Sequence, residues 1–218
     1  VYLLERMICV AVGKPYTIHE NEIEVPFFDE NSFFTHSTFN TSSPRRSGVH
    51  FINQSLKLRR IESHFVEVLK ILPATERRTN NKSEIEKQLP VVKRAFHELE
   101  LWRAGCLSNE LRNFENETLK LYYYRSVRLL IQPFLEVLRP EDRLFRECQA
   151  SAGQICQLYK IFHQKTVTGH STPAVHTVFV AGVTLIYCMW LARNYDDEKR
   201  RKLGDISKHT RPLVSASL

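Results

Sequence analysis

The sequence lacks several patterns that would place it among disulfide-rich, metal-binding or β-rich proteins. Its 218 residues include only 7 Gly and 9 Pro, which argues against a low-complexity segment and against an all-β chain with many turns. The 5 cysteines are odd in number, and no two have the C-x-x-C spacing. They therefore predict neither a disulfide framework nor a zinc site, and they favour a reducing compartment, the cytosol or the nucleus.

The short motifs of common active sites are also missing. The sequence contains no H-E-x-x-H and no G-x-S-x-G. The Gly13–Lys14 pair is not a phosphate loop, because Pro15 follows it and the upstream glycine of that motif is absent. The nine histidines show no common metal-ligand spacing. We therefore predict no catalytic, cofactor-binding or metal-binding residues in this chain, and no enzymatic activity.

The charge is positive but scattered. A net charge of +7 and a pI near 9.2 leave nucleic acid or an acidic surface open as a partner. The Lys and Arg residues form no long stripe, so a soluble protein with excess positive charge is favoured over direct nucleic-acid binding. Three consecutive tyrosines, 122–124, with Arg125 and Arg128 also fit a base-stacking platform. On a helix they would point in three directions, which favours packing in the core.

Helical periodicity dominates what is present, and it predicts an all-α, irregular multi-helix domain. Gly13 is placed to end the first helix in the left-handed conformation, and Pro15 prevents its continuation. Pro133 predicts a kink or a break in the fourth helix. A long polar loop is expected over about 29–50, where Ser and Thr are frequent. Helices are expected over residues 2–12, 51–72, 83–104, 114–139, 141–164 and 174–194.

The segment 174–194 is the most apolar part of the chain. Its length approaches that of a membrane span, but His176, Thr177 and Thr184 lie within it. A buried central helix surrounded by the other helices explains the same composition, and we favour it over a membrane span.

The first 28 residues carry a pattern typical of one family. The stretch "YLLERMICVAVGKPYTIHENEIEVPFF" resembles the end of the middle homology region of fungal zinc-cluster transcription factors. Glu5 and Glu22 stand where that family usually has Asp, and Lys14 stands where it usually has Arg. Pro26 follows the last matching residue directly. The matching residues are Tyr2, Arg6, Gly13, Pro15, Ile18, Ile23 and Val25.

Three later stretches resemble further segments of the same family in the same order. They are "LKLYYYRSVRLLIQPFL" at 119–135, "CQASAGQICQLY" at 148–159 and "FVAGVTLIYCMWL" at 179–191. The four stretches together, in the order of the family, carry the resemblance. The resemblance implies a regulatory domain of a nuclear RNA polymerase II transcription factor. It divides the chain into the end of the middle homology region (1–28), a flexible loop (29–50) and a C-terminal helical part (51–218).

The resemblance also implies where zinc and DNA are bound. Such proteins contact DNA through an N-terminal six-cysteine binuclear zinc cluster, which this sequence does not contain. We therefore expect the chain to be a piece of a longer protein, with zinc and DNA bound by the missing part and no cofactor here. The expected partners are transcription co-regulators, a small-molecule effector and a second copy in a homodimer, but no membrane.

Regulation by a small molecule would require a pocket between helices. We place its wall on the most apolar helix, at Phe179, Val183, Tyr187 and Trp190, with a dry packed core as the alternative. The chain is then a regulatory domain that does not itself contact DNA and controls output through intramolecular, partner or effector contacts. A helical scaffold subunit of the same fold, without transcriptional activity, is the second interpretation.

Overall fold

The computed structural model describes residues 1–24, 26–28, 44–72, 82–106, 113–165 and 172–209. Within these ranges it contains seven α-helices, two 3₁₀ segments and no strand, which confirms the all-α prediction. The 3₁₀ segments are η1 (Glu20–Glu22) and η4 (Gln132–Val137). The α-helices are α1 (Tyr2–Val12), α2 (Pro44–Val68), α3 (Lys82–Lys87), α4 (Leu89–Gly105), α5 (Asn113–Ile131), α6 (Arg143–Lys165) and α7 (Thr172–His209).

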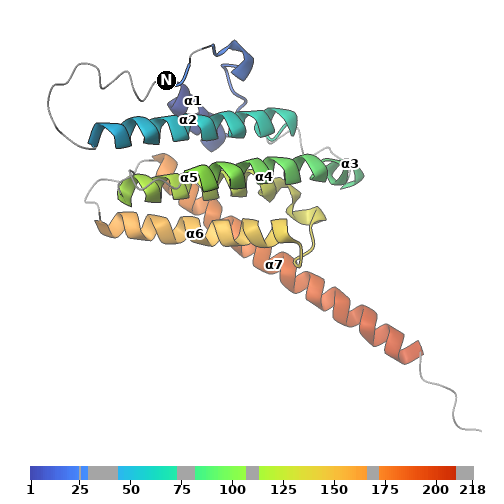
Figure 1. Cartoon of the computed structure of the whole chain (residues 1–218). Helices are drawn as coiled ribbons and strands as arrows, with labels where there is room; N and C mark the ends of the chain where they lie inside the picture. The colour runs from blue at the N-terminus through green and yellow to red at the C-terminus, as the bar shows by residue number, and fades with distance from the viewer. Residues whose placement is uncertain (25, 29–43, 73–81, 107–112, 166–171, 210–218) are drawn as a thin grey trace, which may run out of the picture.

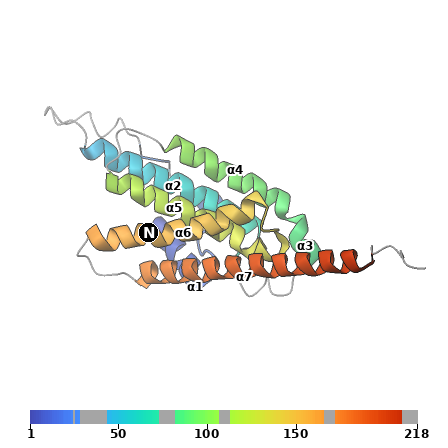
Figure 2. The ribbon, with the colours of Figure 1, turned by 90° about the horizontal axis from the view of Figure 1, so that it is seen from below.

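The helices form a layered bundle with one long helix that leaves it. Figure 1 shows α2, the α4–α5 pair and α6 stacked in successive layers. α5 packs on α2, α4 and α6, and α6 packs in turn on α7. In Figure 2, α1 lies beside the first half of α7, and Figure 1 shows that the C-terminal half of α7 projects beyond the bundle.

The central helix of the bundle is α5. Every residue from Arg125 to Ile131 is buried, and the main hydrophobic cluster contains Val127, Leu130 and Ile131 together with residues of α2, α4 and α6. The prediction of a buried central helix at 174–194 is therefore wrong. Composition indicated the wrong helix, because α5 carries arginines within its buried turns, whereas α7 is nearly free of charge over residues 174–194.

Prolines set two of the helix boundaries. α5 ends at Ile131 and the chain continues as η4, so Pro133 breaks the helix as expected. The predicted helix 83–104 is instead two helices, α3 and α4, with Pro90 in the first turn of α4. A proline is tolerated there, because the first helical N–H groups have no partner inside the helix.

The predicted polar loop over 29–50 is too long. α2 begins at Pro44, so residues 44–50 are helical. The first position of a helix accommodates proline well, and this start was not recognised in a Ser-rich and Thr-rich stretch. Residues 29–43 lie outside the described part of the chain.

α7 has an inner face of small residues and an outer face of large ones. Thr177, Ala181, Thr184 and Cys188 follow helical spacing and are all buried. The hydroxyls of Thr177 and Thr184 donate to the carbonyls four residues before them, at 2.7 and 2.8 Å. This arrangement satisfies the buried hydroxyls and lets α7 approach α6 closely.

The thiol of Cys188 meets that of Cys148 on α6. Their hydrogen bond, together with burial, raises the pKa of Cys148 well above its ordinary value. Both thiols thus act as packing groups at the contact between α6 and α7.

The large apolar side chains of α7 point away from the bundle. Phe179 and Ile186 are each 68% exposed. Among the described helices, α7 is the one that is long and apolar enough to cross a membrane, over Thr172–Arg201. A single helix of this kind is weak evidence for a span. The sequence favours a soluble helix over a membrane span on the expectation that this helix is buried. Only 22% of its most apolar window is buried, so burial gives no support to that choice.

Candidate functional site

Arg6 is the centre of the N-terminal motif. Tyr2 and Arg6 are four residues apart on α1 and share one face, and the turn after Gly13 brings Tyr16 against the same side. The guanidinium carbon of Arg6 lies 4.8 Å from the Tyr2 ring centroid and 4.1 Å from that of Tyr16. The Arg6 side chain is fully buried. Stacking between two aromatic faces suits a guanidinium, which is weakly hydrated and planar.

Two carboxylates complete the surroundings of Arg6. Its Nη1 donates to Glu5 Oε2 at 2.7 Å, and its Nη2 donates to Glu20 Oε2 at 3.3 Å. Glu20 also accepts from the Tyr2 hydroxyl at 2.9 Å and pairs with Arg60 Nε of α2 at 3.3 Å. Glu20 therefore joins η1 to both α1 and α2.

Glu5 holds the segment after Gly13. Its Oε1 accepts from the backbone N–H of Thr17 at 2.8 Å and from the Thr17 hydroxyl at 3.0 Å. Desolvation by burial raises the pKa of Glu5, but the Thr17 hydrogen bonds and the charge of Arg6 outweigh it, so the net pKa is lowered. The carboxylate is thus a structural acceptor, held in its charged form.

The other motif residues are mostly placed around this cluster. Gly13 ends α1 with φ 68° and ψ 27°, which confirms the predicted left-handed cap. Ile18 and Ile23 are half-buried, while Val25 lies outside the described residues. The remaining three are exposed: Lys14, Pro15 and Pro26.

Tyr16 and Glu20 were missed by the sequence analysis, although both contact Arg6. The sequence feature that could have indicated them is one aromatic and one acidic residue in the segment that folds back on α1. It is the buried Tyr16, rather than the isoleucines alone, that fixes this segment on the helices.

A second buried polar cluster joins α2 to α5. Arg59 and Glu62 form a fully buried ion pair. The Ser126 hydroxyl, which has one proton to donate, lies 3.1 Å from the Tyr122 carbonyl oxygen and 3.4 Å from Glu62 Oε1. Arg59 also lies over the ring of Tyr122, at 5.1 Å from its centroid. Burial lowers the pKa of Arg59, but the adjacent Glu62 charge outweighs it and the net pKa is raised. This pair neutralises itself in the interior.

Arg125 and Arg128 are buried on α5 without such a partner. Among the described residues, neither makes a hydrogen bond or an ion pair to a carboxylate. Burial lowers the pKa of both guanidinium groups, to about 10 for Arg128. They remain protonated at neutral pH, so the bundle contains more buried positive than negative charge around α5.

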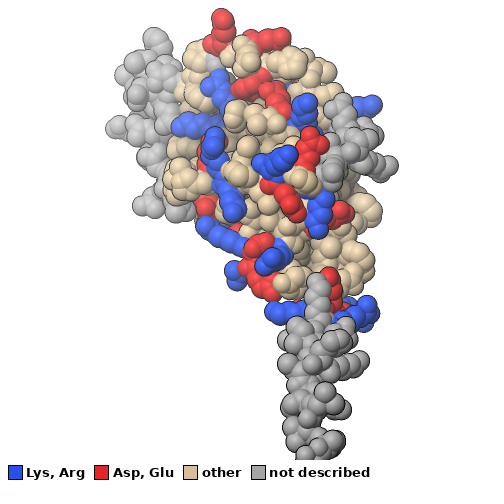
Figure 3. Space-filling model, turned by 90° about the vertical axis from the view of Figure 1, so that its right-hand side faces the viewer, with Lys and Arg blue, Asp and Glu red and all other residues tan. Residues whose placement is uncertain are grey.

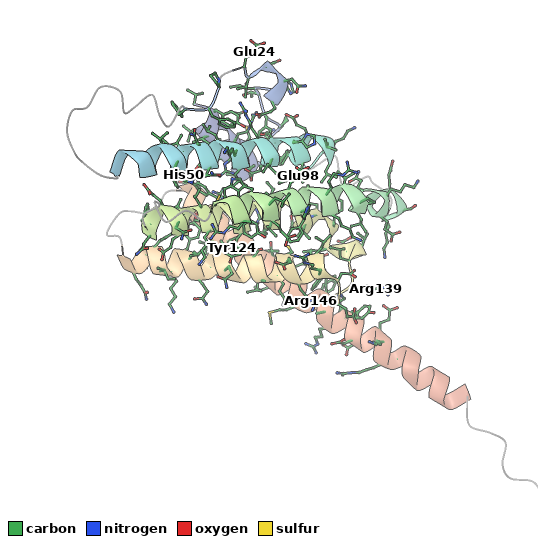
Figure 4. The ribbon with its side chains drawn as sticks, in the orientation of Figure 1. Glu24, His50, Glu98, Tyr124, Arg139 and Arg146 are labelled. Atoms are coloured by element: carbon green, nitrogen blue, oxygen red, sulfur yellow. The ribbon has the colours of Figure 1, made fainter. Side chains whose placement is uncertain are left out.

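A cavity of about 190 Å³ lies where the start of α5, the end of α6 and the start of α7 meet. These three helix ends lie on the same side of the bundle in Figure 1. Arg125 is one of its lining residues. The full set is Met7, Phe114, Thr118, Leu121, Tyr122, Arg125, Tyr159, Phe162, Pro173 and Ala174. Tyr124, labelled in Figure 4, packs next to it against the smaller hydrophobic cluster between α5, α6 and α7.

The four residues predicted to line an effector pocket do not line this cavity. Phe179, Val183 and Trp190 are exposed, on the outer face of α7. Tyr187 is half-buried, stacks on Trp190 with ring centroids 5.8 Å apart and donates its hydroxyl to Glu136 at 2.8 Å. Their placement as inner-wall residues depended on a buried α7 and is corrected with it.

The described residues hold no other concentration of chemistry. No group of three or more His, Cys, Asp or Glu among them could hold a metal ion. A second hollow of about 490 Å³ lies between α6 and the charged part of α7. Apart from Met189 and Ala192, its lining is polar or charged: Gln149, Arg193, Asp196, Asp197 and Arg200.

The all-α fold and the N-terminal motif agree with a regulatory domain of fungal transcription factors, the class to which the chain is similar. Residues 1–104, just under half of the chain, match the model of the fungal specific transcription factor domain. The chain is 69% identical over 219 residues to an uncharacterized transcriptional regulatory protein of Saccharomyces cerevisiae. That match covers 100% of this chain and 16% of the relative.

Two more distant relatives are also named as regulators. One is pyrimidine pathway regulatory protein 1 of Saccharomyces cerevisiae, 26% identical over 95% of this chain and 24% of that protein. The other is a positive regulator of purine utilization from Emericella nidulans, 24% identical over 87% of this chain and 22% of that protein. The chain thus spans a quarter or less of each relative. No solved structure matches it.

Proposed function

We propose that this chain is a non-enzymatic regulatory domain that controls the output of a nuclear, DNA-binding transcription factor. The match of residues 1–104 to the fungal specific transcription factor domain carries the proposal. Similarity to three regulators over most or all of the chain supports it. Zinc and DNA would be bound by an N-terminal cluster outside this chain. Residues 1–28 would end the middle homology region, and the helical part after the loop would complete the domain.

The outer face of α7 is the surface through which we propose that output is controlled. Large exposed apolar patches mark interaction sites, and α1, which packs beside α7, exposes three more aliphatic side chains, Leu4, Ile8 and Val12. The exposed apolar residues of α7 are Val175, Phe179, Val183, Ile186, Met189 and Trp190. The occupant we propose is another segment of the same polypeptide. The chain covers only 16% of its 69%-identical relative, so most of such a polypeptide lies outside it.

Contacts beside α7 argue against a membrane span as the use of this face. Tyr187, in the middle of the apolar stretch, donates to the carboxylate of Glu136. Further along, Lys199 pairs with Glu141 at 3.7 Å. If α7 spanned a membrane, these carboxylates and the adjoining bundle would enter the hydrocarbon layer, at a cost of about 2–4 kcal/mol per buried charge.

A reporter assay in the full-length protein tests the proposal. Phe179→Ser with Ile186→Ser should change transcriptional output several-fold, because the intramolecular contact is lost. Asn194→Ser, an exposed polar position on the same helix, should leave output unchanged. Thermal unfolding of the isolated chain should change little in each variant. Unchanged output in the stable double variant would contradict the proposed surface.

The scaffold interpretation predicts a different full-length protein. A transcription factor of this family should contain zinc bound by a six-cysteine cluster before this domain. Metal analysis of the purified full-length protein measures that zinc directly. If the protein contains no zinc, and if deleting its gene leaves promoter activity unchanged, a helical scaffold subunit with no transcriptional role is favoured.

A further inference from the structure

We propose that the cavity at the start of α5 binds a small, planar, single-ring anion, with Arg125 as its charge partner. The inference rests on the proposed regulatory function, because it names the class of effector that this domain would detect. Four elements line the site, α1, α5, α6 and α7. The residues that carry the argument are Arg125, Tyr122, Tyr159 and Phe162.

The charge of the site comes from Arg125. Arg125 lines the cavity, the residue is only 9% exposed, and the carboxylate of Glu62 acts on it through its charge, without a direct ion pair among the described residues. The nearby carboxylate of Glu62 is already paired with Arg59. A buried, unpaired guanidinium is costly, and an anion in the cavity would supply the missing acceptor.

The walls of the site are aromatic. The rings of Tyr159 and Phe162 are edge to face, with centroids 6.3 Å apart, and Phe114 lies 5.7 Å from Phe162 at the exposed rim. Tyr122 contributes a fourth ring from α5. Flat aromatic walls beside one cation favour a planar ligand with a delocalised negative charge, which can stack and pair at the same time.

The volume of the cavity matches a ligand with one ring. A cavity of about 150 Å³ holds benzene, and this one measures about 190 Å³. The difference leaves room for a carboxylate. Pockets for drug-sized molecules begin near about 300 Å³, so one ring matches the volume of this cavity better than a fused two-ring ligand does.

The position of the cavity connects the ligand to the proposed contact surface. Met7 of α1 and Pro173 and Ala174 of α7 lie on its walls, and these two helices present the exposed apolar residues. A ligand that pairs with Arg125 would hold the first turn of α7 against α5 and α6. It would shift regulation only as far as it binds one arrangement of these helices better than another.

Benzoate is the probe for this site. Calorimetric titration of the whole chain at neutral pH and low salt should show saturable binding of benzoate. The neutral isostere benzamide should bind at least about tenfold more weakly, a difference of about 1.4 kcal/mol. 2-Naphthoate, which has two rings, should bind at least as weakly as benzamide.

Variants separate a built site from general attraction to a basic protein. Arg125→Met should weaken benzoate binding at least about tenfold without lowering the melting temperature, because it removes an unpaired buried charge. Arg128→Met is the matched control, since Arg128 is equally buried on α5 but does not line the cavity, and it should keep benzoate binding. Ala174→Phe fills the cavity from the opposite wall and should abolish binding while Arg125 stays in place.

Three results would overturn the inference. These are no benzoate binding up to about 10 mM, equal binding of benzoate and benzamide, or full binding by folded Arg125→Met. Each leaves the proposed function standing, because output in the reporter assay and zinc content are measured independently of benzoate. Conversely, benzoate binding that depends on Arg125 would survive in a protein without zinc.

Discussion

At the scale of single residues, the guanidinium of Arg6 holds the N-terminal segment together. It is fully buried between Tyr2 and Tyr16 and donates to Glu5 and Glu20. Removing one partner of such a cluster leaves the others desolvated and unpaired, which is more costly than never having made the pair. Arg6 therefore stabilises the fold, and the main effect of replacing it should be a loss of stability.

Arg6→Met should destabilise the domain by about 3 kcal/mol, at the lower end of the range for buried pairs because both carboxylates keep some contact with water. Arg6→Lys should cost less, since it keeps the charge but loses stacking and the two-pronged geometry. Urea unfolding followed by circular dichroism measures both. Equal stability of Arg6→Met and the parent chain would show that the cluster contributes nothing net.

Glu5 should make part of the stability depend on pH. Its pKa is lowered in the folded chain from an ordinary value of 4.5, so its contribution is complete above that value and is lost as pH falls through the folded pKa. Glu5→Gln should therefore cost about 1–2 kcal/mol at pH 7, and the difference from the parent chain should shrink below about pH 4.5. Unfolding curves at pH 7, 5 and 3.5 test this, and a difference that does not vary with pH contradicts it.

Gly13 tests backbone strain separately from crowding. A Cβ at this position would meet nothing within 4 Å, but φ is +68°. Only the left-handed backbone therefore penalises a side chain, by about 1 kcal/mol for Gly13→Ala and about 2 kcal/mol for the β-branched Gly13→Val. Gly13→Asn should cost least, because Asn tolerates this conformation. Melting temperatures in the order Gly, Asn, Ala, Val confirm the cap, whereas equal values would show that it carries no strain.

The sequence predicted this glycine but not the partners of Arg6. Gly13 was recognisable because a helical pattern ends there and Pro15 follows. Tyr16 and Glu20 lie in a segment without periodicity, 10 and 14 residues from Arg6, and nothing local pairs them with it. Arg125 was named in the sequence analysis but assigned to core packing, since sequence cannot tell which buried arginine lacks a carboxylate.

At the scale of elements, the chief error concerned which helix is central. Hydropathy favoured the segment 174–194, yet α7 packs through small residues and exposes large ones. α5 was harder to recognise because Arg125 and Arg128 interrupt its apolar surface. The periodicity of apolar residues predicted that these segments are helices. Their mean hydropathy did not indicate which face of each helix would be covered by other helices.

Two side-chain truncations test whether α5 or α7 is the buried helix. Leu130 of α5 is fully buried, so Leu130→Ala should cost about 2–5 kcal/mol. Ile186 of α7 is 68% exposed, so Ile186→Ala should cost less than about 0.5 kcal/mol. Chemical unfolding of the whole chain compares the two. A larger effect at Ile186 would instead support the buried α7 expected from composition.

At the scale of the whole molecule, the net charge of +7 is spread among charges of both signs. On the face in Figure 3, Lys and Arg alternate with Asp and Glu, and no stripe of one sign is visible there. Several arginines do not contribute to the surface at all, because Arg6, Arg59, Arg125 and Arg128 are buried. Fewer positive side chains can therefore contact a phosphate directly than the composition indicates.

This charge distribution predicts weak and unselective binding of DNA by the chain itself. Without a continuous phosphate-binding surface, affinity for duplex DNA should stay in the non-specific range, with a Kd of about 1–100 µM at physiological salt. Fluorescence anisotropy with several unrelated duplexes should give similar values that weaken steeply as salt rises, because counterion release is the only driving term. The full-length protein, with the proposed zinc cluster, should differ by selecting one sequence. Nanomolar, sequence-selective binding by residues 1–218 alone would contradict this, because it would require base contacts from a surface that mixes both signs of charge.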